Sequence, residues 1–228
     1  MRIRAEYRVG PELRFLANLD MIHVMERALR RARLPYALSE GFNPHIRLSL
    51  GTVLPVGLWG EREYFDLELQ ADMSSEELIN QLNPVLPVGL TVTHCAPIAA
   101  DAPSIMSLVN AASYAFKVRF QDEAVLKKIE MMMAASQLVV ASRGKKKDRP
   151  KDLRPGMHKI AMMRQGQFDI IELWVSTGEP INVRFDELTD LLLAMGLPRE
   201  QIDDVWRSGN YCRSRDHFYT PMEQVKLF

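Results

Sequence analysis

The sequence predicts an α+β protein made of two tandem ferredoxin-like domains, each with the element order βαββαβ. Three observations support this prediction: strand-like alternation of apolar and polar residues, amphipathic helices between the strands, and an Ala/Pro-rich stretch near the middle of the chain. A chain of 228 residues is long enough for two small domains. We place them at residues 1–96 and 113–228, with a linker at 97–112.

The first half opens with a strand and a helix. Arg2–Val9 places apolar residues at every second position, which is typical of a half-buried strand. Asn18 is the expected N-cap of a helix that runs to about Arg33 and ends before Pro35. Its predicted core-facing residues recur at helical spacing: Leu19, Ile22, Met25, Leu29 and Ala32.

Two short strand pieces follow at Tyr36–Leu38 and Ile46–Leu50, and a longer strand at Glu63–Leu69. We interpret Asp66 and Glu68 in this longer strand as solvated charges. The half then continues with a helix capped by Ser74, with Glu77 placed for a capping box, and a strand at Leu90–Cys95.

A similar order of elements recurs in the second half, without a repeat of residues. It predicts strands at Tyr114–Phe120, Leu138–Ser142, Phe168–Val175 and Ile202–Cys212, and helices from Asp122 to about Ala135 and over Phe185–Met195. Met157–Met163 is a candidate partner strand for Phe168–Val175.

Composition sets limits on the class of protein. Lys+Arg and Asp+Glu are both 29, so any attraction to nucleic acid must come from local clusters. No apolar stretch has the length of a membrane helix, and the N-terminus has no signal-peptide core. Cys95 and Cys212 are far apart, which favours reduced thiols in the cytoplasm.

Arginines crowd the C-terminal half of the first predicted helix, at Arg27, Arg30, Arg31 and Arg33, and Arg14 precedes it. Cations at a helix C-terminus are favoured by the helix dipole, so simple capping and solvation explain part of the cluster. The alternative is a surface that binds phosphates, because a guanidinium donates two hydrogen bonds to two phosphate oxygens.

The segment Ser39-Glu40-Gly41-Phe42-Asn43-Pro44-His45 follows as a turn. Phe42 either packs under this turn or is exposed as a platform on which an unpaired base could stack. His45 could carry a proton at neutral pH, although a single histidine is more often structural.

A second basic cluster lies between two predicted strands of the second half. Such a run is either a solvated loop or an electrostatic footprint for RNA. Its cations are Arg143, Lys145, Lys146, Lys147, Arg149, Lys151 and Arg154. The five histidines have no metal-site spacing, and the chain has no cysteine triplet that could bind an iron–sulfur cluster.

Several stretches together resemble a radical-SAM-associated family of unknown function, which occurs alone or fused behind a cobalamin-binding radical-SAM protein. These stretches are Arg14–Asp20, Glu26–Ala32, Ser39–Ser49 and Leu54–Gly57, and Asp152-Leu153-Arg154-Pro155 is similar to the family's Asp-x-Arg-Pro. The family often has His where this chain has Asn18, so no catalytic histidine is expected there. The resemblance implies a radical-SAM partner that carries S-adenosylmethionine and an iron–sulfur cluster, and no cofactor in this chain.

The leading hypothesis is an RNA-binding or substrate-presenting accessory protein for a radical-SAM enzyme that modifies transfer or ribosomal RNA. The arginines of the first helix, Arg14, Arg47 and the second basic cluster would bind phosphates, and Phe42, Asn43 and His45 would meet a base. One alternative is a metal-independent endoribonuclease with His45 as general acid or base, similar to the enzymes that process CRISPR repeats. Another is a protein-interaction module that binds no nucleic acid.

Overall fold

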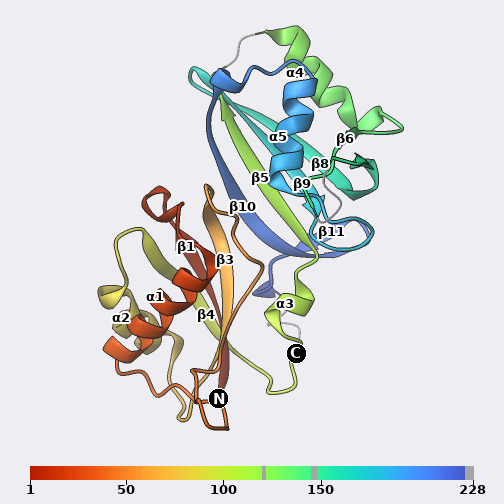
Figure 1. Ribbon diagram of the computed structural model, residues 1–228. Coiled ribbons are helices and arrows are strands. Elements are labelled where there is room, and N and C mark those ends of the chain that lie inside the picture. Colours follow the sequence, from red (N-terminus) through yellow and green to blue (C-terminus); the bar gives the residue numbers. More distant parts are fainter. Residues whose placement is uncertain (120–121, 145–147, 224–228) are drawn as a thin grey trace. The chain divides into compact units, whose positions relative to one another are not determined.

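The computed structural model describes residues 1–119, 122–144 and 148–223 (Figure 1). Helices and mainly antiparallel strands alternate along the chain, which confirms the α+β class. The chain divides into two compact units: unit 1 is Met1–Val109 with Gly209–Phe228, and unit 2 is Asn110–Ser208. None of the described helices is long and apolar enough to cross a membrane.

Unit 1 follows the predicted order of elements. Its strands β1, β3 and β4 pair antiparallel in the order β4-β1-β3, and the short β2 also pairs with β3. The C-terminal part of β10, together with β11, belongs to the same unit. The bounds are β1 Arg2–Val9, α1 Asn18–Arg31, β2 Leu48–Leu50, β3 Trp59–Glu68, α2 Ser75–Leu82, β4 Leu90–Ile98, α3 Ile105–Leu108, β10 Ile202–Ser214 and β11 His217–Tyr219, with 3-10 turns at Pro11–Leu13 and Asn83–Val85.

The helices α1 and α2 cover one face of this sheet (Figure 1). The core between them is formed by alternate residues of β1 and β3 and by the inner sides of both helices: Ile3, Ala5, Tyr7, Val9, Met21, Met25, Ala28, Leu29, Phe65, Leu67, Leu78 and Leu82. The capping box predicted at the start of α2 is confirmed, because Glu77 N donates to Ser74 Oγ (3.2 Å) and Ser74 N donates to Glu77 Oε2 (2.9 Å).

Two predictions for α1 are wrong. The N-cap is Ala17 rather than Asn18, and no side chain caps this end of the helix. The buried face runs through Met21, Met25 and Leu29, so Met25 and Leu29 were predicted correctly, but Leu19 lies off this face and is 69% exposed. In the first turns of α1 it is Met21 that packs into the core of unit 1, and Met21 was not among the predicted core-facing residues.

The opposite face of the unit 1 sheet holds a buried ion pair. The side chain of Arg4 donates to both carboxylate oxygens of Asp66, at 2.7 and 3.0 Å, and both residues are nearly inaccessible (1% and 3% exposed). Asp66 also accepts hydrogen bonds from Arg2 (2.8 Å) and from the backbone of Ile105 (3.1 Å). The prediction that Asp66 is solvated is therefore wrong, whereas Glu68 is exposed as predicted for a solvated charge.

The covering segment is part of the predicted linker. Strand β4 continues to Ile98, and the chain then folds back so that the carbonyl of Pro103 accepts a hydrogen bond from Arg4 (2.9 Å). Ile105 and Val109 pack with Tyr64 in a small buried cluster. Residues 97–109 are therefore a packed part of unit 1, and the boundary with unit 2 falls at Asn110.

Unit 2 contains a sheet with the order β10-β5-β9-β8, in which β9 pairs antiparallel with β5 and β8. The pairing of β8 with β9 confirms the partner expected for Phe168–Val175. The predicted strand at Leu138–Ser142 exists as β6, but it pairs with β7 in a separate two-stranded sheet. The bounds are β5 Ala111–Val118, α4 Glu123–Glu130, β6 Val139–Ala141, β7 Pro150–Asp152, β8 Met157–Gln165, β9 Phe168–Ser176 and α5 Phe185–Ala194, with 3-10 turns at Met131–Ala134, Arg154–Gly156 and Arg199–Gln201.

Candidate nucleic-acid interface

The C-terminal half of α1 presents its arginines to solvent. Arg27 Nε donates to its own helix at His23 O (3.1 Å), and Arg30 forms a loose ion pair with Glu26 (3.7 Å). The exposed side chains of Arg31 and Arg33 form no hydrogen bond or ion pair with any described residue. These two guanidinium groups therefore remain available for an anionic ligand.

Arg33 has a strained backbone at the end of α1. Its φ angle is +52°, in the left-handed region where glycine is the usual residue. Arg33 N donates to Arg30 O (3.1 Å) and Leu34 N donates to Leu29 O (3.3 Å), the bonding pattern that ends many helices with glycine. An arginine here costs about 1–2 kcal/mol relative to a relaxed conformation. Backbone strain of this kind motivates the hypothesis that the side chain has a function.

The segment predicted as a turn is the tip of a β-hairpin, residues 37–47, which we call the hairpin. Leu38 pairs with Ile46, Ser39 N donates to His45 O (2.8 Å), and Arg47 N donates to Ala37 O (2.9 Å). Five consecutive residues at the tip, 41–45, are all exposed. Phe42 is fully exposed (105%), so of the two alternatives for its ring, packing under the turn is wrong.

The hairpin and the end of α1 lie at the same end of unit 1. Tyr36 pairs with Leu69 just beyond β3, and Ala37 N donates to Glu68 O (2.8 Å). Leu69 in turn exchanges hydrogen bonds with Met1 at the start of β1. Only four residues separate α1 from Tyr36, so the end of α1 and the base of the hairpin both lie where β1 begins and β3 ends. We call this the basic end of unit 1.

Arg47 stands at the base of the hairpin and Arg14 does not. Arg47 is exposed and pairs with Glu68 at 2.9 Å, on the strand that carries the hairpin. Arg14 precedes α1, whose 14 residues span about 20 Å, so it lies at the other end of the helix. Its side chain donates to Pro11 O (3.0 Å), and its carbonyl accepts from Gly57 N (2.7 Å). Arg14 therefore lies apart from the arginines in the C-terminal half of α1, as expected for a residue that precedes the helix.

Three of the four described cations of the second basic cluster are engaged inside unit 2. Arg143 forms a two-bond pair with Asp190 (2.7 and 3.1 Å), and this pairing raises the pKa of its guanidinium. Lys151 Nζ donates to the buried carboxylate of Glu187 (2.6 Å). Arg154 donates to three backbone carbonyls, of Met133, Ala135 and Met157. These contacts favour structural roles for the three cations.

Of the remaining cations in that cluster, Arg149 is exposed. Lys145, Lys146 and Lys147 lie outside the described residues. The structure therefore leaves Arg149 as the described residue of this cluster that an RNA phosphate could reach without breaking an internal contact.

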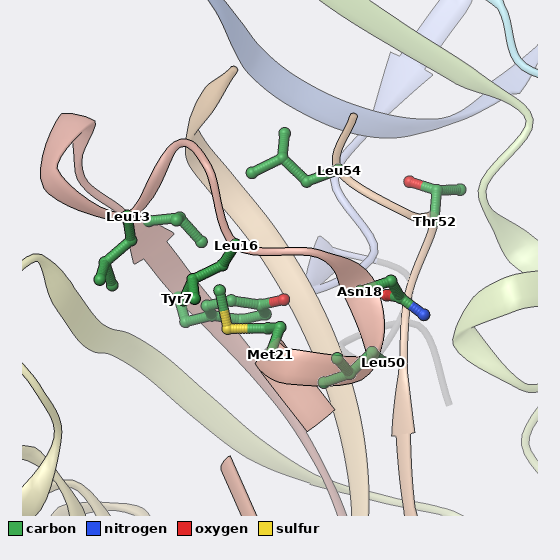
Figure 2. A pocket seen from close by; sticks show the side chains of 9 residues that line it. Tyr7, Leu13, Leu16, Asn18, Met21, Leu50, Thr52 and Leu54 are labelled. Atoms are coloured by element: carbon green, nitrogen blue, oxygen red, sulfur yellow. The ribbon is translucent and has the colours of Figure 1, made fainter. Parts of the chain in front are cut away.

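A small pocket lies at the other end of α1, where β1 ends (Figure 2). Its interior of about 20 Å³ has room for about one water molecule. Figure 2 shows apolar side chains around it, with the amide of Asn18 and the hydroxyl of Thr52 as polar groups at its wall. The full lining is Tyr7, Val9, Leu13, Leu16, Asn18, Met21, Leu50, Thr52 and Leu54.

Exposed apolar side chains adjoin the residues that line this pocket. Phe15 (76% exposed) and Leu19 flank the lining residues Leu16 and Asn18, and Val53 lies between Thr52 and Leu54. Val56 is held nearby by the hydrogen bond between Gly57 and Arg14. We call Phe15, Leu19, Val53 and Val56 the apolar rim. This feature was not predicted from the sequence, although apolar residues in two loop segments that resemble the radical-SAM-associated family were a usable signal.

The described residues contain no group of three or more His, Cys, Asp or Glu side chains that could hold a metal ion. His45 is exposed, and its backbone N–H, rather than its ring, donates to Ser39 Oγ (3.0 Å). No ion pair or hydrogen bond of its ring occurs within the described chain. The geometry at the basic end is therefore that of a binding surface, with cations, an aromatic ring and polar side chains.

Comparisons with known proteins identify the family. The model of the family described as "Uncharacterized protein conserved in bacteria (DUF2344)" matches residues 2–185. No curated protein matches the sequence. Among solved structures, a chain in "Crystal Structure of a Cbf5-Nop10-Gar1 Complex" is similar to this chain, with a TM-score of 0.51 and 11% identity. The match covers 99% of this chain and 54% of that chain, so this chain spans about half the length of its structural neighbour.

Proposed function

This chain belongs to the DUF2344 family, and we propose that it is an RNA-binding or substrate-presenting accessory protein that works in the cytoplasm with a radical-SAM enzyme in RNA modification. The observation that carries the proposal is the basic end of unit 1. There, Arg31 and Arg33 are exposed without internal partners among the described residues, next to a hairpin with a fully exposed Phe42.

The chemistry of this end supports nucleic acid as its ligand. Guanidinium groups bind phosphate oxygens through paired N–H donors. Aromatic rings beside such cations stack on bases, which is how proteins commonly bind single-stranded nucleic acid. A chain with equal numbers of cationic and acidic residues has no bulk attraction for RNA, so binding must come from such a local cluster.

The apolar rim is the proposed surface for the radical-SAM partner. Exposed apolar side chains that gather around one place on a protein surface are candidates for binding another protein. The rim lies on two of the stretches, Arg14–Asp20 and Leu54–Gly57 with their neighbours, that resemble the radical-SAM-associated family. The partner would carry S-adenosylmethionine and the iron–sulfur cluster, and this chain would bind RNA at the opposite end of α1.

We further propose that both units are ferredoxin-like domains. In unit 1 the four strands β1 to β4 have the order β4-β1-β3-β2, and in unit 2 the order is β10-β5-β9-β8. Both orders place the first and third strands of the unit in the centre of its sheet, with β6 and β7 as an insertion in unit 2.

The endoribonuclease alternative gains no support from a specific contact, since the exposed ring of His45 has no general-acid or general-base partner among the described residues. Catalysis of RNA cleavage needs such groups close to the reacting atoms. Comparison of RNA cleavage in chelator by the wild type and by His45→Ala tests it directly. Cleavage that depends on His45 would replace the binding proposal.

Filter binding of the purified chain to total RNA, over a series of salt concentrations, tests the proposed function. Counterion release predicts that the affinity falls steeply as salt rises, and weak or salt-insensitive binding would contradict it.

A pull-down of the radical-SAM partner with wild type and Phe15→Ala tests the apolar rim. Partner retention that survives nuclease and is lost with Phe15→Ala is the expected result, and equal retention by both proteins would contradict the rim assignment.

A further inference from the structure

We propose that the tip of the hairpin is a subsite for a single unpaired nucleobase, which stacks on the ring of Phe42. This inference rests on the proposed function, because it names the part of the RNA that the basic end selects. The arginines would bind the phosphates of the same strand, and the hairpin would restrict binding to RNA in which a base is free.

The exposure of Phe42 is the first argument. Its ring is fully exposed, whereas the neighbouring Ile46, at the foot of the same hairpin, is buried. A phenylalanine on a surface loses the hydrophobic stabilisation that burial provides, and a flat ligand that covers the ring restores it. A flat ligand could therefore cover the ring without displacing another side chain.

The second argument is that the hairpin closes the backbone loop that carries the ring. The pairing of Leu38 with Ile46 and the two hydrogen bonds between Ser39 and His45 close the loop directly below the tip. Gly41 supplies a φ angle of +117°, and an added Cβ there would meet no atom within 4 Å. A platform that is ordered before binding loses less conformational entropy when the ligand arrives.

The third argument is the distribution of charge. The exposed tip contains Glu40 and no arginine or lysine, while Arg47 stands at the base of the hairpin and Arg33 lies four residues before it. A tip with a carboxylate disfavours phosphate and suits an uncharged group. Phe42 lies at most about 17 Å from Arg47 and about 30 Å from Arg33 along an extended chain, a distance that a short strand of RNA can span.

The fourth argument selects an unpaired base. A base inside a duplex has both faces covered by its neighbours, so a single protruding ring can stack only on a base that is free or splayed out. The exposed side chains of Asn43 and His45, within three residues of Phe42 in the same tip, can donate and accept hydrogen bonds at the edge of such a base. The hairpin offers one ring, and therefore one base site.

The experiment compares the full-length wild type with Phe42→Ala, Phe42→Trp and Val88→Ala. Val88 is a matched control, because it is also a large exposed apolar residue in a turn of unit 1. The probes are an oligouridylate of about 12 nucleotides and an RNA duplex of similar length. Binding is measured by fluorescence anisotropy at fixed salt.

We expect Phe42→Ala to weaken oligouridylate binding by about 5- to 150-fold, the range for loss of one stacked base. Duplex binding should be unchanged, Phe42→Trp should retain the wild-type affinity, and Val88→Ala should bind as the wild type does. If Phe42→Ala binds both probes like the wild type, the base subsite is overturned while salt-dependent RNA binding, and with it the proposed function, stands. If the wild type binds neither probe nor total RNA, the proposed RNA-binding function is contradicted, and the base subsite that rests on it is contradicted as well. Loss of a nuclease-resistant protein partner by Phe42→Ala, with RNA binding intact, would overturn the subsite in favour of a protein contact.

Discussion

Replacement of Arg33 by glycine should separate RNA binding from stability. Arg33 has a φ angle of +52°, and release of that strain by Arg33→Gly favours the folded state by about 1–2 kcal/mol. The greater backbone freedom of glycine in the unfolded chain opposes this by about 0.5–1 kcal/mol. We therefore expect a protein that is equally stable or about 1 kcal/mol more stable, and that binds RNA more weakly.

The loss of one phosphate contact to single-stranded RNA should make the plot of log affinity against log salt less steep by about 0.7. Filter binding over a salt series measures this slope, and urea unfolding measures the stability. Arg215→Gly is the matched control, because Arg215 is also exposed and has a φ angle of +55°. It should gain a similar amount of stability and keep the wild-type slope. An unchanged slope for Arg33→Gly, or equal changes in both variants, would refute the role of Arg33.

Three further predictions concern the fold. Asp66→Ala should destabilise unit 1 by about 3–5 kcal/mol, because it leaves the buried guanidinium of Arg4 without its carboxylate. Glu68→Ala removes an exposed ion pair from the same strand and should cost less than about 1 kcal/mol. Hydrogen exchange of β1 measures both variants, and an equal loss of protection in Asp66→Ala and Glu68→Ala would contradict this account. Burial raises the pKa of Cys212 to about 11, so iodoacetamide at about pH 8 should label this thiol only after unfolding, and rapid labelling of the native protein would show that the thiol is accessible. Hydrogen bonds at the N-cap of α2 hold the pKa of Glu77 below its ordinary 4.5. The contribution of the Glu77 carboxylate to stability is therefore complete above that pH and is lost as the pH falls below it. Hydrogen-exchange protection of α2 should decrease in acid, and constant protection would argue against the capping box.

Features set by local sequence could be predicted. The alternation of Arg2–Val9 and the Ser74–Glu77 capping box depend on residues within a few positions of one another, and both are found in the structure. The same holds for Asp122, whose side chain accepts from Ala124 N at 2.9 Å at the start of α4. These signals require no knowledge of tertiary contacts.

Features set by distant contacts could not be predicted. Asp66 alternates with apolar residues as a solvated residue would, but the segment that contains Ile105 folds back over it, about 40 residues further along the chain. Lys151 resembles a solvated cation in sequence, yet its partner Glu187 lies 36 residues away in α5. Long-range burial of this kind leaves no periodic signal.

The candidate site was predicted in part. The cluster of arginines and the loop Ser39–His45 were identified from sequence, because charge density and turn residues are local signals. The exposure of Phe42 needed the structure, since an aromatic residue in a turn packs inward or outward depending on the rest of the unit. The second basic cluster is the reverse case, because Arg143 and Arg154 form internal bonds that the charge pattern did not reveal.

The most direct test of the central claim, that the basic end of unit 1 binds RNA through its phosphates, is the salt dependence of oligouridylate binding by the wild type and by the double variant Arg31→Gln/Arg33→Gln. The account predicts that the double variant has a slope less steep than the wild type by about 1.4, because two phosphate contacts are lost. The control pair Arg199→Gln/Arg215→Gln removes two exposed arginines outside the basic end and should keep the wild-type slope. A wild-type slope near zero, or equal reductions in the two double variants, would contradict the claim.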